Sequence, residues 1–343
     1  MRENRSHTNY GLWAGMTADV ASDDTVLDAM FNTGIVGFKG FLSESGIDDF
    51  KRLDRQALSR AMAYCGQKGA VLALRAEWED TIKQFAHPIR QTDRKDVSAF
   101  LDSRPVDAEL KAAELAMEEA AKYGTKVHIV HVSHPKVVEL IQSAKKTGVD
   151  VSLETCPHYL IFNEEDFIQQ GPLLKCAPPL RDSDCVNGLW EKVKNKQIDC
   201  ISSDHSPCPL SMKQAGNENI WEAWGGIQGV QFGTTAFLSQ AMSRGLSLEE
   251  VLPMLTANVA SRFPSLEKQG EIKIGNQANL TIYHSDSKTV FKKEDILFRH
   301  PYSPYVGQEV QGNVEATIVN GNLVFDREKG MLSDPFGKDI CAM

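Results

Sequence analysis

The chain has 343 residues, enough for one large domain or two smaller ones. Hydrophobic residues make up 42% of it and charged residues 24%, as in a typical soluble globular protein. The net charge of −9 argues against nucleic acid as a partner, and no apolar run approaches the roughly 20 residues that a membrane helix needs. The 7 cysteines form no Cys-x-x-Cys pair and fit reduced thiols in the cytoplasm better than a disulfide framework.

Short apolar segments alternate with segments of helical period through most of the chain. The pattern predicts strands at 10–15, 36–42, 70–76, 126–133, 149–155 and 199–203. It predicts helices at 54–66, 107–124 and 134–148, and later at 226–245 and 247–262. Strands that alternate with helices predict an α/β fold with a parallel sheet.

The pattern changes after Gly270, where β segments are predicted at 271–283 and 315–325. Asn320-Gly321 lies inside the second segment and predicts a tight hairpin turn. We therefore expect a β/α domain over residues 1–268 and a small β domain with a C-terminal segment over 269–343. Only six β/α units precede Asp204, whereas a closed (β/α)₈ barrel has eight. The first domain is predicted to be an open six-stranded sheet or a barrel that lacks its first two units.

The segment from Ile201 to Pro207 ends the sixth predicted strand with Ser-Ser-Asp-His-Ser-Pro. In parallel α/β proteins the reactive groups lie where strands stop, so Asp204 is placed to bind a metal or to accept a proton. A structural hydrogen-bonding role is the alternative.

Lys39 lies between glycines in an apolar strand, where an unpaired ammonium is costly. Its stem could pack while its ammonium reaches the end of the strand. Alternatively, CO₂ could carboxylate it to a carbamate that bridges two metals.

His128 and His131 are three positions apart on one predicted strand, so alternation directs them to opposite faces. His131 lies nearer the C-terminal end of the strand and is the better candidate for a metal ligand. For His128 we favour a buried structural histidine, and for His158 and Tyr159 we favour a role in shaping their loop.

Six motifs occur in order along the chain: Gly37-Phe-Lys-Gly-Phe41, His128-Ile-Val-His-Val-Ser133, Glu154-Thr-Cys-Pro-His-Tyr-Leu160, Cys176-Ala-Pro-Pro-Leu-Arg181, Ser202-Ser-Asp-His-Ser-Pro207 and Ser303-Pro-Tyr-Val-Gly307. Together they resemble the cyclic amidohydrolases of the metal-dependent amidohydrolase superfamily, which include allantoinases, dihydroorotases and dihydropyrimidinases (hydantoinases). The resemblance covers nearly the whole chain and is strongest to the allantoinase group, because Ser-Ser-Asp-His-Ser-Pro, Trp-Gly-Gly-Ile and Ser-Pro-Tyr-x-Gly favour it.

The resemblance implies a TIM-barrel metal-dependent hydrolase fold with part of a small β-sandwich domain at the C-terminus. It implies two divalent metals, usually zinc, bridged by a carboxylated lysine that Lys39 matches. His131 and Asp204 match further metal ligands, and Asp204 would also shuttle the proton during hydrolysis. Backbone near Ala177 and Gly226 would bind the substrate. In an allantoinase the reaction opens the hydantoin ring of allantoin to give allantoate. The partners implied are a small ureide substrate and other copies of the chain, commonly in a tetramer.

Two departures from the family pattern concern the metals. The family's His-x-His pair on the first barrel strand has no counterpart here, and Arg75 stands where the fifth strand carries a histidine ligand. A guanidinium stays protonated and cannot bind a metal, and about three protein ligands are normal for a catalytic zinc. We expect a homologue of the allantoinases that lacks part of the barrel, with impaired activity. The alternatives are another cyclic amidase, of the hydantoinase or dihydroorotase type, and a non-catalytic scaffold on the same fold.

Overall fold

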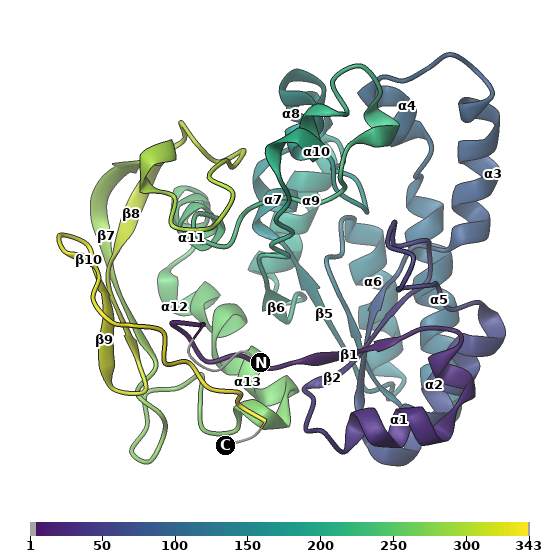
Figure 1. Ribbon diagram of the computed structural model, residues 1–343, viewed down its shortest axis with the longest axis horizontal. Coiled ribbons are helices and arrows are strands. Elements are labelled where there is room, and N and C mark those ends of the chain that lie inside the picture. Colours follow the sequence, from purple (N-terminus) through teal and green to yellow (C-terminus); the bar gives the residue numbers. More distant parts are fainter. Residues whose placement is uncertain (1–4, 342–343) are drawn as a thin grey trace.

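The computed structural model describes residues 5–341 and is built around a six-stranded sheet (Figure 1). The strands are β1 (Trp13–Met16), β2 (Gly37–Phe41), β3 (Val71–Arg75), β4 (Lys126–Ile129), β5 (Val151–Thr155) and β6 (Cys200–Ile201). Each strand pairs in parallel with the next along the chain, in the order β1-β2-β3-β4-β5-β6. The six predicted strands and the α/β fold are confirmed, although β4 and β6 are shorter than predicted.

Helices connect these strands. The α-helices are α1 (Asp24–Phe31), α2 (Arg55–Lys68), α3 (Glu79–Arg90), α4 (Val97–Asp102), α5 (Val106–Tyr123), α6 (Pro135–Lys146), α7 (Pro157–Ile161), α8 (Glu164–Gln170), α9 (Ser183–Lys194) and α10 (Leu210–Gln214). The 3₁₀ turns are η1 (Val20–Ser22), η2 (Gly171–Leu174) and η3 (Ile220–Glu222). The predicted helix limits have a physical basis: the Asp54 carboxylate accepts from the Ala57 amide at 2.8 Å to start α2, and Gly124, with φ 64°, ends α5.

One face of the parallel sheet is apolar and covered by helices. Two rows of neighbouring side chains cross the strands on this face: Phe38, Leu72, Val127 and Val151, then Leu74, Ile129 and Leu153. All of them are buried in the main hydrophobic core. Helices α2, α5 and α6 pack against this face (Figure 1). Because side chains alternate along a strand, the residues between these rows point to the other face.

The second face of the sheet carries polar groups. Lys39 is the register partner of Ala73, which pairs with His128, which in turn pairs with Ser152. This face of the sheet also contacts the C-terminal part of the chain, because Phe263 packs edge-on against Trp13 and His128. We call this surface the polar face.

Three α-helices and two 3₁₀ turns lead into the C-terminal sheet: α11 (Gly233–Ser243), α12 (Leu248–Val251), η4 (Leu252–Leu255), α13 (Ala257–Arg262) and η5 (Pro264–Leu266). A further 3₁₀ turn, η6 (Lys293–Asp295), lies between the first two strands of that sheet. The helix predicted over 226–245 begins later, at Gly233. The helix predicted over 247–262 is divided into α12, η4 and α13, because Pro253 has no amide hydrogen to continue α12.

A four-stranded antiparallel sheet completes the chain, in the order β10-β9-β8-β7. Its strands are β7 (Leu280–Val290), β8 (Glu309–Val319), β9 (Asn322–Asp326) and β10 (Gly330–Met331). The hairpin at Asn320-Gly321 is confirmed, with φ angles of 50° and 80° that suit a tight turn between β8 and β9. The strand predicted over 271–283 is wrong for its first part, which turns at Gly275 with φ 94°.

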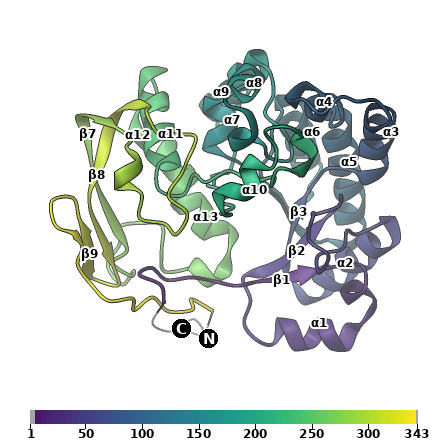
Figure 2. The same ribbon diagram turned by 45° about the horizontal axis from the view of Figure 1, so that its top comes forward.

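Helices α11 and α13 lie between the two sheets in both views (Figures 1 and 2). The two ends of the described chain also meet, since Tyr10 and Asp339 form a β-bridge. The predicted domain boundary at 268 falls in the segment between η5 and β7. Of the helices within residues 5–341, none combines the length and the apolar character needed to cross a membrane.

Candidate functional site

Five titratable side chains gather on the polar face near the C-terminal ends of the strands: Lys39, Arg75, His131, Glu154 and Asp204. Their charges act on one another: Asp204, Glu154 and Arg75 all affect the pKa of Lys39, and Lys39 and Arg75 affect that of His131. The structure thus brings the three residues that match the family's metal ligands to one end of the sheet.

Lys39 lies in the middle of β2 and is partly buried. Burial lowers the pKa of its ammonium to about 8, and the Asp204 and Glu154 carboxylates oppose that shift. Its Nζ lies 5.6 Å from the centroid of the Phe41 ring. Within residues 5–341 no carboxylate or carbonyl forms an ion pair or hydrogen bond with this ammonium, so it is available to a ligand.

His131 and Asp204 share a strained backbone. Their φ angles are 42° and 41°, in the left-handed region that residues other than glycine rarely adopt. Such strain is concentrated at functional sites, where the surrounding structure holds it in place. The left-handed turn also follows the early end of β4 at Ile129, so strand alternation does not extend to His131. The argument that alternation sets His128 and His131 on opposite faces therefore does not apply.

Asp204 is exposed to solvent but lies among many protein atoms in the loop after β6. Desolvation raises the pKa of its carboxyl to about 6, with Lys39 and Arg75 opposing the shift and Glu154 adding to it. His131 is only 4% exposed, and burial together with the charge of Lys39 holds its pKa well below the usual value. At neutral pH the site thus has a mostly ionised Asp204 and a neutral His131 imidazole.

His128 is the buried structural histidine that we favoured. Its Nδ1 lies 2.7 Å from Ser152 Oγ and its Nε2 lies 3.1 Å from Glu154 Oε2. Burial acts to raise the pKa of Glu154, but the hydrogen bond with His128 and the charge of that ring, together with Ser202 and Lys39, outweigh burial and keep the pKa low. His158 and Tyr159 are also buried, and the Tyr159 hydroxyl donates to the Pro178 carbonyl at 2.7 Å.

Arg75 belongs to a buried ionic group. Its Nη2 lies 3.3 Å from Glu77 Oε2, and Arg104 Nη1 lies 2.8 Å from the same oxygen. Glu77 is fully buried; burial acts to raise its pKa, but Arg104 and then Arg75 outweigh burial and keep it low. Two guanidinium groups therefore share one carboxylate oxygen, and Arg104 has the shorter contact.

A second buried ion pair lies behind the first. Arg181 Nη2 contacts Glu109 Oε1 at 2.6 Å, and its Nη1 donates to the Arg104 carbonyl at 2.7 Å. The Ser133 hydroxyl also donates to Glu109, and burial raises the pKa of Glu109. This pair fixes the loop after β4 relative to the Pro-Pro loop, which contains Arg181.

The two segments expected to bind substrate are adjacent. The Gly226 amide donates to the Lys175 carbonyl at 2.9 Å, two residues before Ala177. The Lys213 ammonium donates to the same carbonyl at 3.0 Å. Lys175 itself is buried and donates to the carbonyls of Ile220, Trp221 and Ala223. These contacts hold the Ala177 and Gly226 segments as one unit, and whether they contact a substrate stays a prediction.

The chain is similar to known proteins in both sequence and fold. A model described as the amidohydrolase family matches residues 14–324. The chain belongs to the amidohydrolase family.

This amidohydrolase is similar in sequence to allantoinases. The chain is 38% identical over 336 residues to an allantoinase of Rubrobacter xylanophilus, a match that covers 98% of this chain and 72% of that protein. It is 36% identical to an allantoinase of Solibacter usitatus, over 95% of this chain and 70% of that one. The L-hydantoinase (dihydropyrimidinase) structure from Arthrobacter aurescens superposes with a TM-score of 0.92 at 29% identity, over 96% of this chain and 72% of that one. The amidohydrolase fold is thereby confirmed.

Membership of this family implies a binuclear divalent metal centre. The next question is whether the side chains present could hold two metal ions. Within residues 5–341, no group of three or more His, Cys, Asp or Glu side chains is arranged to hold a metal ion. Arg75 adds a fixed positive charge that acts on Lys39, His131 and Asp204. The donor set of this amidohydrolase, in the part that the structure describes, does not fit a two-metal centre.

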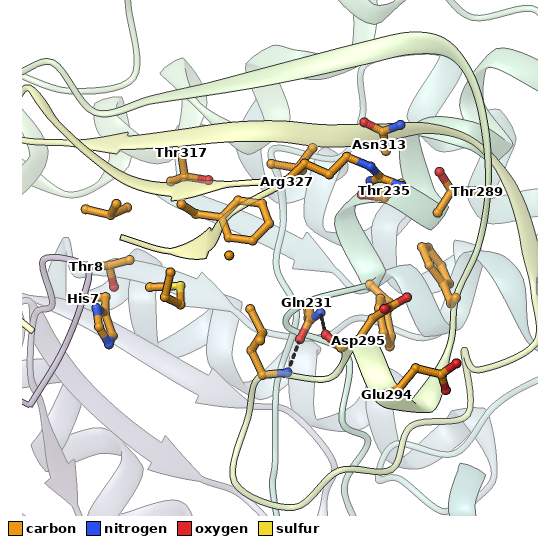
Figure 3. A pocket seen from close by; sticks show the side chains of 18 residues that line it. His7, Thr8, Gln231, Thr235, Thr289, Glu294, Asp295, Asn313, Thr317 and Arg327 are labelled. Carbon is orange, nitrogen blue, oxygen red and sulfur yellow. Dashed lines mark hydrogen bonds between the residues drawn. The ribbon is translucent and has the colours of Figure 1, made fainter. Parts of the chain in front are cut away.

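A cavity of about 630 Å³ lies elsewhere, between the antiparallel sheet and α11 (Figure 3). Gln231 lines it and hydrogen-bonds the backbone of Asp295 and Leu297 at 2.6 and 2.9 Å. None of the residues expected to act in catalysis or metal binding lines this cavity. The polar face therefore remains the candidate site.

The sequence analysis missed the partners that shape the polar face. Glu154 stood inside a recognised motif without a role, and Glu77 stood two residues after Arg75. The signal in both cases was a carboxylate at the end of a predicted strand. No such signal marks Glu109, Arg104 or Arg181, because their pairing joins distant segments of the chain.

Proposed function

We propose that this amidohydrolase hydrolyses the ring amide of allantoin to allantoate. The observation that carries the proposal is the 38% identity to a named allantoinase over 98% of the chain. The polar face supports it, because Lys39, His131 and Asp204 come together there. A small ureide is accordingly the proposed substrate, and the cytoplasm the proposed compartment. The allantoinase relatives favour allantoin over the substrates of hydantoinases, since the hydantoinase neighbour is 29% identical.

The reaction adds water to a ring carbonyl carbon and breaks the ring carbon–nitrogen bond, leaving a carboxylate and an N–H group. Asp204 is proposed to accept the proton of the attacking water and return it to the leaving nitrogen; with a pKa of about 6 it is mostly ionised at neutral pH. Lys39 and Arg75 put positive charge on the same face, where negative charge develops on the carbonyl oxygen. Zinc is the metal that the family would supply.

The test is allantoin hydrolysis by the purified chain, alone and with zinc, cobalt or manganese plus bicarbonate. We expect turnover that falls at least about 100-fold in Asp204→Ala, the usual share of a proton-transfer group. Lys39→Ala is expected to lose activity too. Asp184→Ala, which removes an exposed carboxylate of α9, is the matched control. Dihydroorotate and dihydrouracil, assayed in parallel, separate this activity from that of other cyclic amidases.

A second candidate is a non-catalytic member of the family, and Arg75 favours it because a guanidinium cannot replace a histidine ligand. Absence of turnover on all three substrates, from a chain shown to be folded by circular dichroism, would establish that alternative.

A further inference from the structure

We propose that the centre of the polar face is a metal-independent binding site for a ureido carboxylate, whose carboxylate group is held by Arg75 and Lys39. A ureido carboxylate carries a carboxylate next to urea N–H groups. The choice of allantoate within this class rests on the proposed function, whereas the chemical class follows from the side chains.

Arg75 is the first element of the site, because its charge is incompletely neutralised. Glu77 Oε2 is 2.8 Å from Arg104 but 3.3 Å from Arg75, and the Arg75 Nε has no partner among the described residues. The Arg75 side chain remains 12% exposed. A guanidinium presents donors in a planar fork that matches a carboxylate, so Arg75 can bind an anion where a histidine could bind a metal.

Lys39 supplies the second cation, from the neighbouring strand. Lys39 Nζ and Arg75 Cζ lie 5.6 and 5.9 Å from the centroid of the same Phe41 ring. The two cations therefore lie beside one aromatic side chain, and the charge of Arg75 acts on the Lys39 ammonium. Neither has a metal-binding lone pair while protonated, and together they repel a metal ion.

Two carboxylates on the same face restrict the ligand. Asp204 and Glu154 are the negative groups that act most on Lys39, so a simple anion gains little net attraction. They can instead accept hydrogen bonds from N–H groups. A ligand that has a carboxylate at one end and urea N–H groups at the other satisfies both signs. His131, 4% exposed with no partner for its Nδ1 among the described residues, adds a neutral polar group.

Calorimetric titration of chelator-treated protein with allantoate tests the proposal, with inorganic phosphate as the probe for a simple anion. We expect allantoate to bind and phosphate to bind more weakly. Arg75→Gln should weaken allantoate binding about 10- to 100-fold, the usual effect of losing a hydrogen bond to a charged group. Lys39→Met should weaken it as well, and Arg75→Lys should fall between, since it keeps the charge but loses the fork. Arg60→Gln, an exposed residue of α2, removes the same charge elsewhere and should bind like the native chain.

Three outcomes would overturn the proposal. They are absence of allantoate binding by folded native protein, equal affinity in Arg75→Gln, and binding that appears only after zinc and bicarbonate are added. If Arg75→Gln does not fold, Arg75→Lys and Lys39→Met carry the test. Because the measurement is equilibrium binding, a chain that binds allantoate without hydrolysing allantoin would refute the proposed function alone.

Discussion

The two faces of the parallel sheet come from the same strands but differ in every property that decides their role. The helix-covered face carries Phe38, Leu72 and Leu74, all fully buried. The polar face carries Lys39 and Arg75 at the alternate positions of the same strands. One face thus contributes apolar burial to stability, while the other exposes charges whose mutual pairing is incomplete. Substitutions should therefore separate folding from binding by face, even when they lie on one strand.

The largest loss of stability is expected when a large side chain on the helix-covered face is truncated. Phe38→Ala should lower the free energy of unfolding by about 3–5 kcal/mol, because it leaves a cavity beside Tyr64, whose ring centroid is 5.8 Å away. Phe41→Ala, on the polar face of the same strand, should cost about 1–2 kcal/mol because Phe41 is only partly buried. Urea denaturation measures both values. Equal losses would show that the two faces contribute alike to stability.

The next largest loss of stability is expected from the buried ion pairs of Glu77 with Arg75 and Arg104. Glu77→Gln should destabilise by about 3 kcal/mol, since it leaves Arg75 and Arg104 without their buried counter-charge. Glu118→Gln breaks the exposed ion pair with Arg55 and should change stability by at most about 0.5 kcal/mol. Thermal denaturation of the two variants compares them. A Glu77→Gln variant as stable as Glu118→Gln would mean that the ionic group is dispensable for folding.

Periodicity was enough to predict the parallel sheet, and turn chemistry was enough to predict the hairpin of the antiparallel sheet. The six strands and Asn320-Gly321 depend on local patterns, namely apolar runs and residues that tolerate positive φ. Pro253 could have predicted the break between α12 and α13, but the helical period on both sides of it hid the signal. The ends of β4 and β6 could not be predicted, because His131 and Asp204 adopt a left-handed backbone that no local sequence signal marks.

The candidate site was predictable only as far as its motifs extend. Lys39, His131 and Asp204 came from motifs, and Arg75 was recognised as a departure from the family pattern. The pairing of Arg75 with Glu77, and of Glu77 with Arg104, depends on how helices pack after the strands have formed. Sequence spacing alone does not reveal such contacts, because residue 77 lies in the loop after β3 and residue 104 in the loop after α4.

A smaller effect should come from the loops that adjoin the polar face. An added Cβ at Gly226 would clash with the Oγ and Cβ of Ser206, so Gly226→Ala must displace the loop that follows Asp204. We expect a loss of about 1–3 kcal/mol, typical of overpacking. Gly225→Ala has open space at the same point and should stay within about 0.5 kcal/mol of the native chain. Urea denaturation of both variants would detect the difference. Equal stabilities would show that the loop containing Ser206 can move at little cost in free energy.

The last effect concerns pH and Lys175, the buried lysine whose carbonyl accepts from the Gly226 amide. Burial, and then the charge of Lys213, lowers the pKa of Lys175 to about 7, whereas an unfolded lysine has a pKa of about 10.4. Between these values the unfolded chain binds more protons than the folded one, so stability should rise with pH in that window. Below pH 7 both states are protonated and the cost of the buried ammonium is present in full.

The melting temperature of the native chain should accordingly rise between pH 7 and 9 relative to that of Lys175→Met. Lys213 and Lys39, with pKa values of about 8, shift stability in the same direction, so the slope of the variant should decrease without disappearing. An unchanged slope would mean that the three carbonyls around Lys175 keep its ammonium charged.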